Sequence, residues 1–163
     1  MNRFALSATG LMAASASAAP VEINVTLDYW AGEAGITIFD SSSNIVASFF
    51  VSSGYLTAPG FSSYALTVNG SSAYSSGYTL ILTGDFAEGD YGISLTDSYG
   101  DGWAWNGVAG GVNSYGGSAT GDAISFGSSA SSGYSVQGSF SVVPAPAGLA
   151  LLGLAGLSRR RRG

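Results

Sequence analysis

The stretch VEINVTLDY, residues 21–29, alternates apolar and polar side chains without a break. Because successive side chains of a strand point to opposite faces, this period of two predicts a strand with one buried and one solvated face. Asp28 falls on the solvated face in this pattern. The apolar set, predicted to face a core, consists of Val21, Ile23, Val25, Leu27 and Tyr29.

Shorter runs of the same kind follow along the chain, at residues 35–40, 45–51, 64–68, 78–83, 91–96, 123–126 and 134–142. Clusters of Ser, Gly, Asn and Asp separate these runs, as at residues 40–44 and 69–70. No window of the sequence has the period of an amphipathic helix. The pattern predicts a single all-β domain over residues 19–142, an antiparallel β-sandwich of jelly-roll type.

Residues 1–18 have the three parts of a secretory signal peptide. Arg3 supplies the positive start, residues 4–14 are mildly apolar, and residues 16–18 read Ala-Ser-Ala, the small-x-small pattern that precedes cleavage. The alternative is an Ala- and Ser-rich N-terminus without a targeting role. We expect export, with a mature chain that begins near Ala19.

Residues 143–163 predict a second processing signal, built from a VPAP sequence, an apolar run and an arginine cluster. The apolar run covers residues 147–157 and would form a helix of about 16 Å. A bilayer core is ~30 Å thick, so this helix is too short for a permanent anchor. The arginines that follow predict a stop-transfer end on the cytoplasmic side.

This tail resembles the PEP-CTERM sorting signal of exported bacterial proteins, which joins a Val-Pro-Glu-Pro-like motif, an apolar helix and an arginine-rich end. The resemblance covers about the last 21 residues, and Ala145 stands where the commonest form has Glu. It implies export machinery and an exosortase-type membrane protease as partners, with transient membrane association through the C-terminal helix. It also implies processing near the prolines and delivery to the cell surface or the medium, whereas a plain membrane anchor is the alternative. The residues that carry it are Val143, Pro144, Ala145, Pro146, Arg159, Arg160, Arg161 and Arg162.

The charge distribution excludes several classes of function. The chain has no Cys, His or Lys, and its five arginines lie in the two terminal segments. All ten carboxylates lie between them, so the predicted domain carries −10 although the whole chain carries −5. Catalysis by His or Cys, the usual zinc sites, disulfides and a P-loop are excluded. Such a domain repels nucleic acid, and a divalent cation is its expected small partner.

Half of the carboxylates fall within residues 85–101, which suggests a calcium site. Asp97, Asp101 and Gly102 have the spacing of positions 1, 5 and 6 of a calcium-binding loop. The EF-hand ligands at positions 3 and 12 are missing, so a weak extracellular Ca²⁺ site would need Asp90, or another acid of this group, close to Asp97 and Asp101. The alternative is that both aspartates accept backbone hydrogen bonds in Asx turns, with glycines at positive φ.

The same segment is similar to a motif of secreted bacterial β-sandwich modules, a strand followed by Thr-Asp-Ser-Tyr-Gly-Asp-Gly-Trp, here residues 96–103. Those modules commonly continue with Asn-Gly, whereas Ala104 and Trp105 intervene here before Asn106. The resemblance implies a β-sandwich at the cell surface and no particular activity.

Aromatic residues of this segment suggest a ligand platform. Trp103 and Trp105 are two residues apart and would share one face of a strand. With Tyr99 and Tyr91 they predict a surface on which a sugar ring stacks. The alternative is that at least one tryptophan closes the end of the core.

Three functions follow from the sequence. The leading hypothesis is an exported, non-enzymatic structural or interaction protein of the cell surface or extracellular matrix, with extracellular polysaccharide as partner. The second is a calcium-assisted carbohydrate-binding module that uses Asp97, Asp101, Trp103 and Trp105. The most remote is a glycoside hydrolase with two carboxylates, because a domain of short strands leaves little room for a deep cleft.

Overall fold

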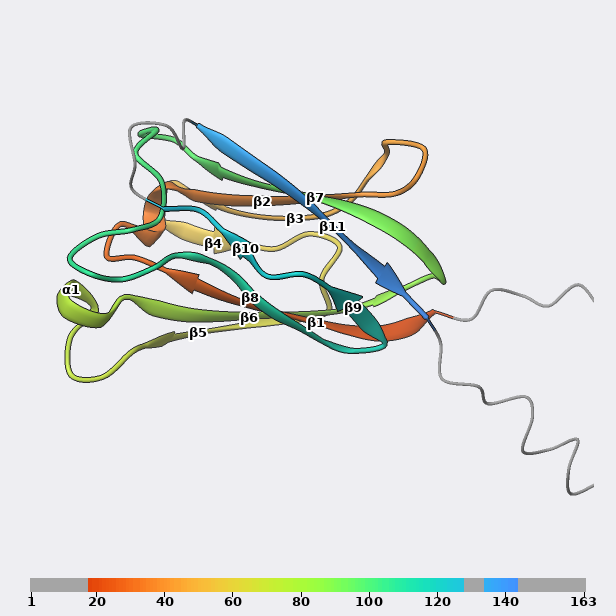
Figure 1. The fold of residues 1–163 in the computed structure, drawn as a ribbon, viewed down its shortest axis with the longest axis horizontal. Coiled ribbons are helices and arrows are strands. Elements are labelled where there is room, and N and C mark those ends of the chain that lie inside the picture. Colours follow the sequence, from red (N-terminus) through yellow and green to blue (C-terminus); the bar gives the residue numbers. More distant parts are fainter. Residues whose placement is uncertain (1–17, 128–133, 144–163) are drawn as a thin grey trace, which may run out of the picture.

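The computed structural model describes residues 18–127 and 134–143. They form two antiparallel sheets packed face to face, which confirms the predicted all-β sandwich (Figure 1). The predicted signal peptide before Ala18 and the sorting residues after Val143, the two prolines and four arginines among them, lie outside the described residues.

The first sheet has five strands in the order β10-β8-β1-β6-β5. β1 lies at its centre and pairs along its length with β6 on one side and β8 on the other. The strands are β1 (Ala19–Leu27), β5 (Ser63–Val68), β6 (Tyr78–Phe86), β8 (Gly111–Gly117) and β10 (Ile124–Ser125).

The second sheet has six strands in the order β4-β3-β2-β7-β11-β9. β7 pairs with β2 and β11 and is central in the way that β1 is central to the first sheet. The strands are β2 (Ala34–Phe39), β3 (Ile45–Ser52), β4 (Tyr55–Thr57), β7 (Gly89–Asp97), β9 (Ala119–Gly121) and β11 (Ser135–Val142).

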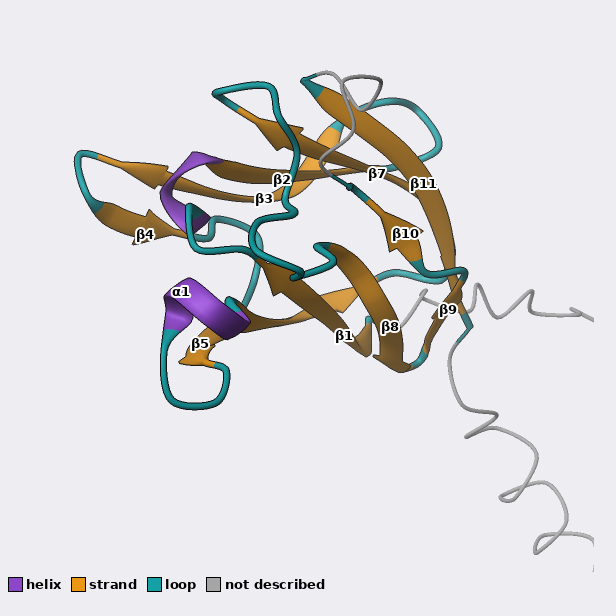
Figure 2. Ribbon diagram, turned by 60° about the vertical axis from the view of Figure 1, so that its left-hand side comes forward, coloured by secondary structure: helices purple, strands orange, loops and turns teal. Residues whose placement is uncertain are grey.

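Two single-turn helices complete the described chain, the 3-10 helix η1 (Ala31–Glu33) and α1 (Ala73–Ser76). Both are visible in Figure 2, at the end of the sandwich where β1 finishes. In this part of the chain no helix has the length and hydropathy that spanning a membrane requires.

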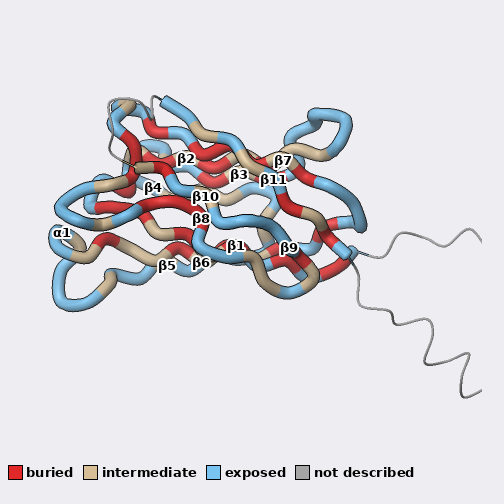
Figure 3. The backbone as a smooth tube through the Cα atoms, viewed as in Figure 1, coloured by how far each residue is buried: buried red, intermediate tan, exposed pale blue. Residues whose placement is uncertain are grey.

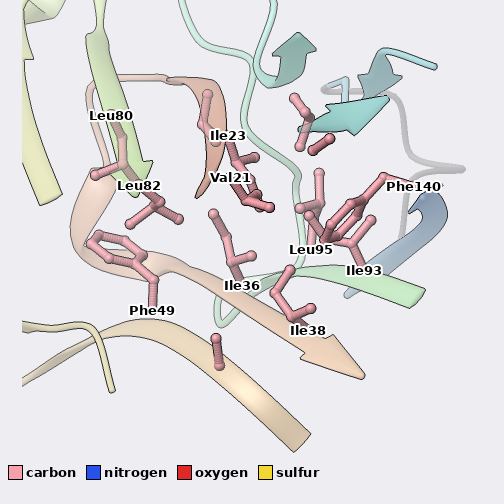
Figure 4. Packing of buried hydrophobic residues seen from close by; sticks show 14 of the residues in the cluster. Val21, Ile23, Ile36, Ile38, Phe49, Leu80, Leu82, Ile93, Leu95 and Phe140 are labelled. Atoms are coloured by element: carbon pink, nitrogen blue, oxygen red, sulfur yellow. The ribbon is translucent and has the colours of Figure 1, made fainter. Parts of the chain in front are cut away.

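The core consists of the alternating apolar positions of both sheets. Val21, Ile23, Val25 and Leu27 are all buried, as the sequence pattern predicts. They pack against inward residues of β2, β3, β6, β7 and β11, and buried and exposed residues alternate along these strands (Figures 3 and 4). Burial of aliphatic side chains at ~25 cal/mol per Å² is the main stabilising contribution.

The predicted strand over residues 21–29 ends two residues early. β1 stops at Leu27, and the prediction for the last two positions is wrong: Asp28 is 5% exposed, whereas Tyr29 is 38% exposed. The Asp28 Oδ1 accepts a hydrogen bond from the Trp30 N–H at 2.8 Å, an Asx turn that ends the strand and reverses the alternation. The turn brings the aromatic side chains of Tyr29 and Trp30 to the surface.

The sequence pattern does not predict β4, β8 or β9. In β8 the pairing with β1 shifts so that Ser114 lies opposite Asn24 and Val112 lies opposite Val25. Asn113 is therefore the extra residue of a β-bulge, which hides the period of two. The predicted strand over residues 123–126 is reduced to the two residues of β10.

The chain enters and leaves the sandwich at the same end, on the right in Figure 1. The Ser118 N–H donates to the Pro20 carbonyl at 2.7 Å, and the Val143 N–H donates to the Ser118 carbonyl at 2.9 Å. The segments that follow β1 and β7 lie at the opposite end, about 26 Å away by the eight residue steps of β1. The candidate site is at that opposite end.

Candidate functional site: an aromatic and acidic end pocket

Three carboxylates converge where β7 ends and β2 begins. One oxygen each of Glu33, Asp97 and Asp101 lies within 4.8 Å of the other two. The register of the second sheet explains this, because Ala34 pairs with Asp97 and the Ser98 N–H donates to the Glu33 carbonyl at 3.0 Å. These three residues are called the carboxylate cluster.

Asp97 is held rigidly within the cluster. Its side chain is 3% exposed, and its Oδ1 accepts hydrogen bonds from the N–H groups of Tyr99 at 2.7 Å and Gly100 at 2.9 Å. Gly100 and Gly102 have φ of 92° and 83°, a backbone region that favours glycine. The Asx turn predicted for Asp97 is confirmed.

Asp90 lies far from the cluster. It is seven residues before Asp97 along β7, which corresponds to about 23 Å. Its Oδ1 accepts a hydrogen bond from the Ser141 hydroxyl at 2.6 Å, and it lines a separate cavity of about 420 Å³ with Asp85 and Glu88. The structure therefore does not bring Asp90 to Asp97 and Asp101, and Glu33 occupies the third place instead.

The cluster and the neighbouring Asp28 repel one another electrostatically. Burial raises the pKa of Asp28; the hydrogen bond from Trp30 opposes this change, and the charges of Asp97 and Asp101 add to it. Burial likewise raises the pKa of Glu33, and the charges of Asp97, Asp101 and Asp28 raise it further. No cationic side chain occurs in residues 18–127 and 134–143 to offset this repulsion. A positive charge at this place would therefore be stabilised.

Replacing Asp28 with asparagine tests this electrostatic description. A carboxyl whose pKa is raised by folding lowers stability as the pH rises through its folded-state pKa, and has no such effect below its unfolded-state pKa. The amide oxygen of asparagine can still accept the bond from Trp30. We expect Asp28→Asn to raise the free energy of unfolding at neutral pH by about 1 kcal/mol, with no gain in acid. Urea unfolding at several pH values measures this.

The matched control for that experiment is Asp122→Asn, because Asp122 is an exposed acid that belongs to neither the cluster nor its surroundings. A change within ~0.5 kcal/mol is expected for it. A wild type that is more stable than Asp28→Asn at neutral pH would contradict the unfavourable burial and repulsion of the Asp28 carboxylate.

Four exposed aromatic residues gather beside the cluster. Their rings meet edge to face, with centroid distances of 5.0 Å for Tyr29 and Trp30, 6.5 Å for Trp30 and Trp105, 6.3 Å for Trp105 and Tyr74, and 5.5 Å for Tyr74 and Tyr29. They come from the turn after β1, from α1 and from the loop after β7. The Asn106 side-chain amide donates to the Tyr74 carbonyl at 3.2 Å and links two of these segments. The four residues are called the aromatic quartet.

The other predicted platform residues lie elsewhere. Trp103 is 2% exposed, its Nε1–H donates to the Thr96 carbonyl at 3.2 Å, and its ring packs on Phe126. Residues 103–105 are not a strand, so the two tryptophans do not share a face; Trp103 closes the core, as the alternative predicts. Tyr91 is also buried, stacked on Phe140. Only Tyr99 and Trp105 of the predicted platform remain available to a ligand.

A cavity of about 350 Å³ joins the quartet to the cluster. This volume lies in the lower part of the ~300–1,000 Å³ range of small-molecule sites. Aromatic residues form its walls, and the indoles of Trp30 and Trp105 stand at 78° to each other. Its lining, called the end pocket, consists of Trp30, Glu33, Tyr99, Asp101 and Trp105. Flat apolar walls with carboxylates between them can hold a ring that carries polar groups.

The sequence pattern misses four residues of this site, Tyr29, Trp30, Glu33 and Tyr74. A signal exists for the first two, because a Tyr-Trp pair follows an aspartate at the end of a strand, where an Asx turn breaks the alternation. Nothing near Glu33 or Tyr74 in the sequence indicates their positions, which depend on pairing between distant segments.

Comparison with known proteins finds no relative of this chain. No protein-family model, no curated protein and no solved structure matches the chain. The features that indicate a function are the geometry of the end pocket and the two terminal sequence signals.

Proposed function

We propose that this chain is an exported, non-enzymatic binding protein of the cell surface or extracellular matrix, and that its sandwich holds extracellular polysaccharide in the end pocket. The observation that carries the proposal is the position of the pocket. It lies at the end of the sandwich opposite Val143, the first residue of the predicted sorting tail. While the tail holds the domain at the membrane, the pocket would lie at the end of the sandwich away from the attachment point.

The chemistry of the pocket supports a carbohydrate ligand. The axial C–H groups of a sugar ring form an apolar face that packs on an indole or phenol ring. Trp30, Tyr99 and Trp105 offer such faces, and all three are exposed in the free protein. The neighbouring carboxylates of Glu33 and Asp101 can accept hydrogen bonds from sugar hydroxyls.

Export and sorting are tested by intact mass spectrometry of the protein from the cell surface and from the medium. We expect a chain that starts near Ala19 and lacks Arg159, Arg160, Arg161 and Arg162, because both terminal signals would be removed. Replacement of the four arginines with serine is expected to retain the uncut tail. An exported wild-type protein with its arginine tail intact would contradict the sorting proposal.

A second candidate function is calcium-assisted binding, which the carboxylate cluster favours. Ca²⁺ takes six to eight oxygen ligands, and the cluster offers three carboxylates, with one oxygen of each within 4.8 Å of the others. In this candidate the metal offsets the mutual repulsion of Asp28, Glu33, Asp97 and Asp101.

The calcium candidate predicts a large thermal shift. At a concentration about a hundredfold above Kd, Ca²⁺ is expected to stabilise the domain by about 2.7 kcal/mol relative to chelator. Asp101→Asn should lose most of this shift, and Asp90→Asn should keep it as the matched control. Thermal unfolding with calcium and with chelator measures both. If Ca²⁺ does not raise the unfolding temperature of the wild type, or if both variants lose the same part of this rise, the calcium candidate is contradicted.

A glycoside hydrolase fits the cluster less well. The Oδ1 of the buried Asp97 accepts hydrogen bonds from two backbone N–H groups, so this oxygen is already engaged within its own turn. A catalytic carboxylate must reach the scissile bond or a water beside it. Polysaccharide turnover that Asp97→Asn abolishes would overturn the non-enzymatic proposal.

A further inference from the structure

The end pocket combines two features that select for the charge of its ligand. Its walls are aromatic, and the charged side chains that line it, Glu33 and Asp101, are both negative. Asp97 is buried, with a carboxylate oxygen within 4.8 Å of one oxygen of each of them, and the described residues include no cation. A ligand that enters the pocket meets a negative potential against aromatic faces.

We infer that the ligand of the end pocket carries a positively charged amine, as the de-N-acetylated hexosamine units of a polysaccharide do. The inference rests on the proposed function, because it names the class of polysaccharide that the same pocket selects. Two interactions would stabilise an ammonium group in this pocket. It would pair with Glu33 or Asp101, and it would lie against the indole faces of Trp30 and Trp105 in a cation–π contact.

The other classes of sugar fit less well. An acidic sugar brings a further negative charge to a domain of net charge −10 and is repelled. A neutral sugar can stack but leaves the repulsion between Glu33 and Asp101 in place. The raised pKa of Glu33 has the same origin, since burial and the neighbouring negative charges disfavour its ionised form in the free protein. An amine relieves this repulsion, and a neutral ring does not.

The second acidic cavity of the domain provides an internal comparison. It contains Asp85, Glu88 and Asp90, but its aromatic residues Phe86 and Tyr91 are buried. The Tyr91 hydroxyl is engaged with the Ala87 carbonyl at 2.8 Å. Acidic charge without an exposed aromatic wall should attract an amine only weakly, through screened surface electrostatics.

The test is calorimetric titration of the exported protein with three oligosaccharides of equal length: β-1,4-linked glucosamine, its N-acetylated form and β-1,4-linked glucose. We expect the glucosamine oligomer to bind about tenfold more tightly than the other two. Glu33→Gln or Asp101→Asn should remove most of this preference, and Trp105→Ala should weaken all three. The matched controls Glu88→Gln and Asp122→Asn remove one acid outside the pocket and should preserve the preference.

The outcomes separate this inference from the proposed function. Equal binding of the three oligomers would overturn the amine inference and leave stacking of a polysaccharide in place. Equal losses in Glu88→Gln and Glu33→Gln would also overturn it, since the preference would then come from net charge. If Ca²⁺ increases the affinity for the glucosamine oligomer, a metal and not the amine offsets the negative charge of the cluster, and the inference is overturned. Absence of binding by all three would overturn the inference and the proposed function together.

Discussion

Replacing Trp103 with alanine is expected to lower the free energy of unfolding by about 3–5 kcal/mol. Its ring is buried against Phe126 at the end of the core, with a centroid distance of 5.3 Å. The substitution leaves a large cavity and also deprives the Thr96 carbonyl of its hydrogen bond from the indole. Denaturant unfolding followed by circular dichroism measures the loss.

Trp105→Ala is the matched control, because it removes the same side chain two residues further along the same loop. Trp105 is 40% exposed and packs edge to face on Trp30 and Tyr74, so its loss should cost about 1–2 kcal/mol of stability, clearly less than the loss of Trp103. Comparable destabilisation by the two substitutions would contradict the assignment of Trp103 to the core and Trp105 to the surface.

Trp105→Ala is instead expected to reduce polysaccharide affinity by more than about tenfold. The indole forms one wall of the end pocket and contacts Trp30 and Tyr74 edge to face, so its removal opens the pocket and loosens the aromatic quartet. Calorimetry with polysaccharide purified from the matrix of the producing cells measures the change.

Tyr55→Ala controls for the loss of an exposed aromatic residue elsewhere. Tyr55 lies on β4, at one edge of the second sheet, and does not line the end pocket. The Tyr55→Ala protein should bind the polysaccharide with the affinity of the wild type. Unchanged affinity in a folded Trp105→Ala protein would place the ligand elsewhere.

The fold could be predicted where one face of a strand is solvated and the backbone is regular. β1, β2, β3, β5, β6, β7 and β11 correspond to predicted runs, because apolar side chains recur at their inward positions. The outward face is less regular, since β3 exposes Ile45 and Phe50. β8 could not be recognised, because its bulge at Asn113 places Val112 and Tyr115 on the same side although they are three residues apart. A bulge depends on the partner strand and leaves no local signature.

The candidate site could be predicted only in part, because three separate segments build it. The local spacing identified Asp97 and Asp101, since both lie in one Gly-rich turn. Glu33 joins them through the pairing of β2 with β7, and Tyr74 reaches Trp105 through α1. These are long-range contacts, which a periodic pattern does not encode. Strand periodicity predicts Trp103 on the ligand platform, and this prediction is wrong because residues 103–105 are not a strand.

Amide chemical-shift mapping of the isotope-labelled protein, during titration with the purified matrix polysaccharide, locates the bound ligand on the sandwich. If the end pocket binds the polysaccharide, we expect shifts concentrated in residues 28–33, 72–76 and 97–107, the three segments that surround the end pocket. Shifts concentrated around residues 85–91, at the opposite end of the sandwich, or no shifts at all, would contradict binding in the end pocket.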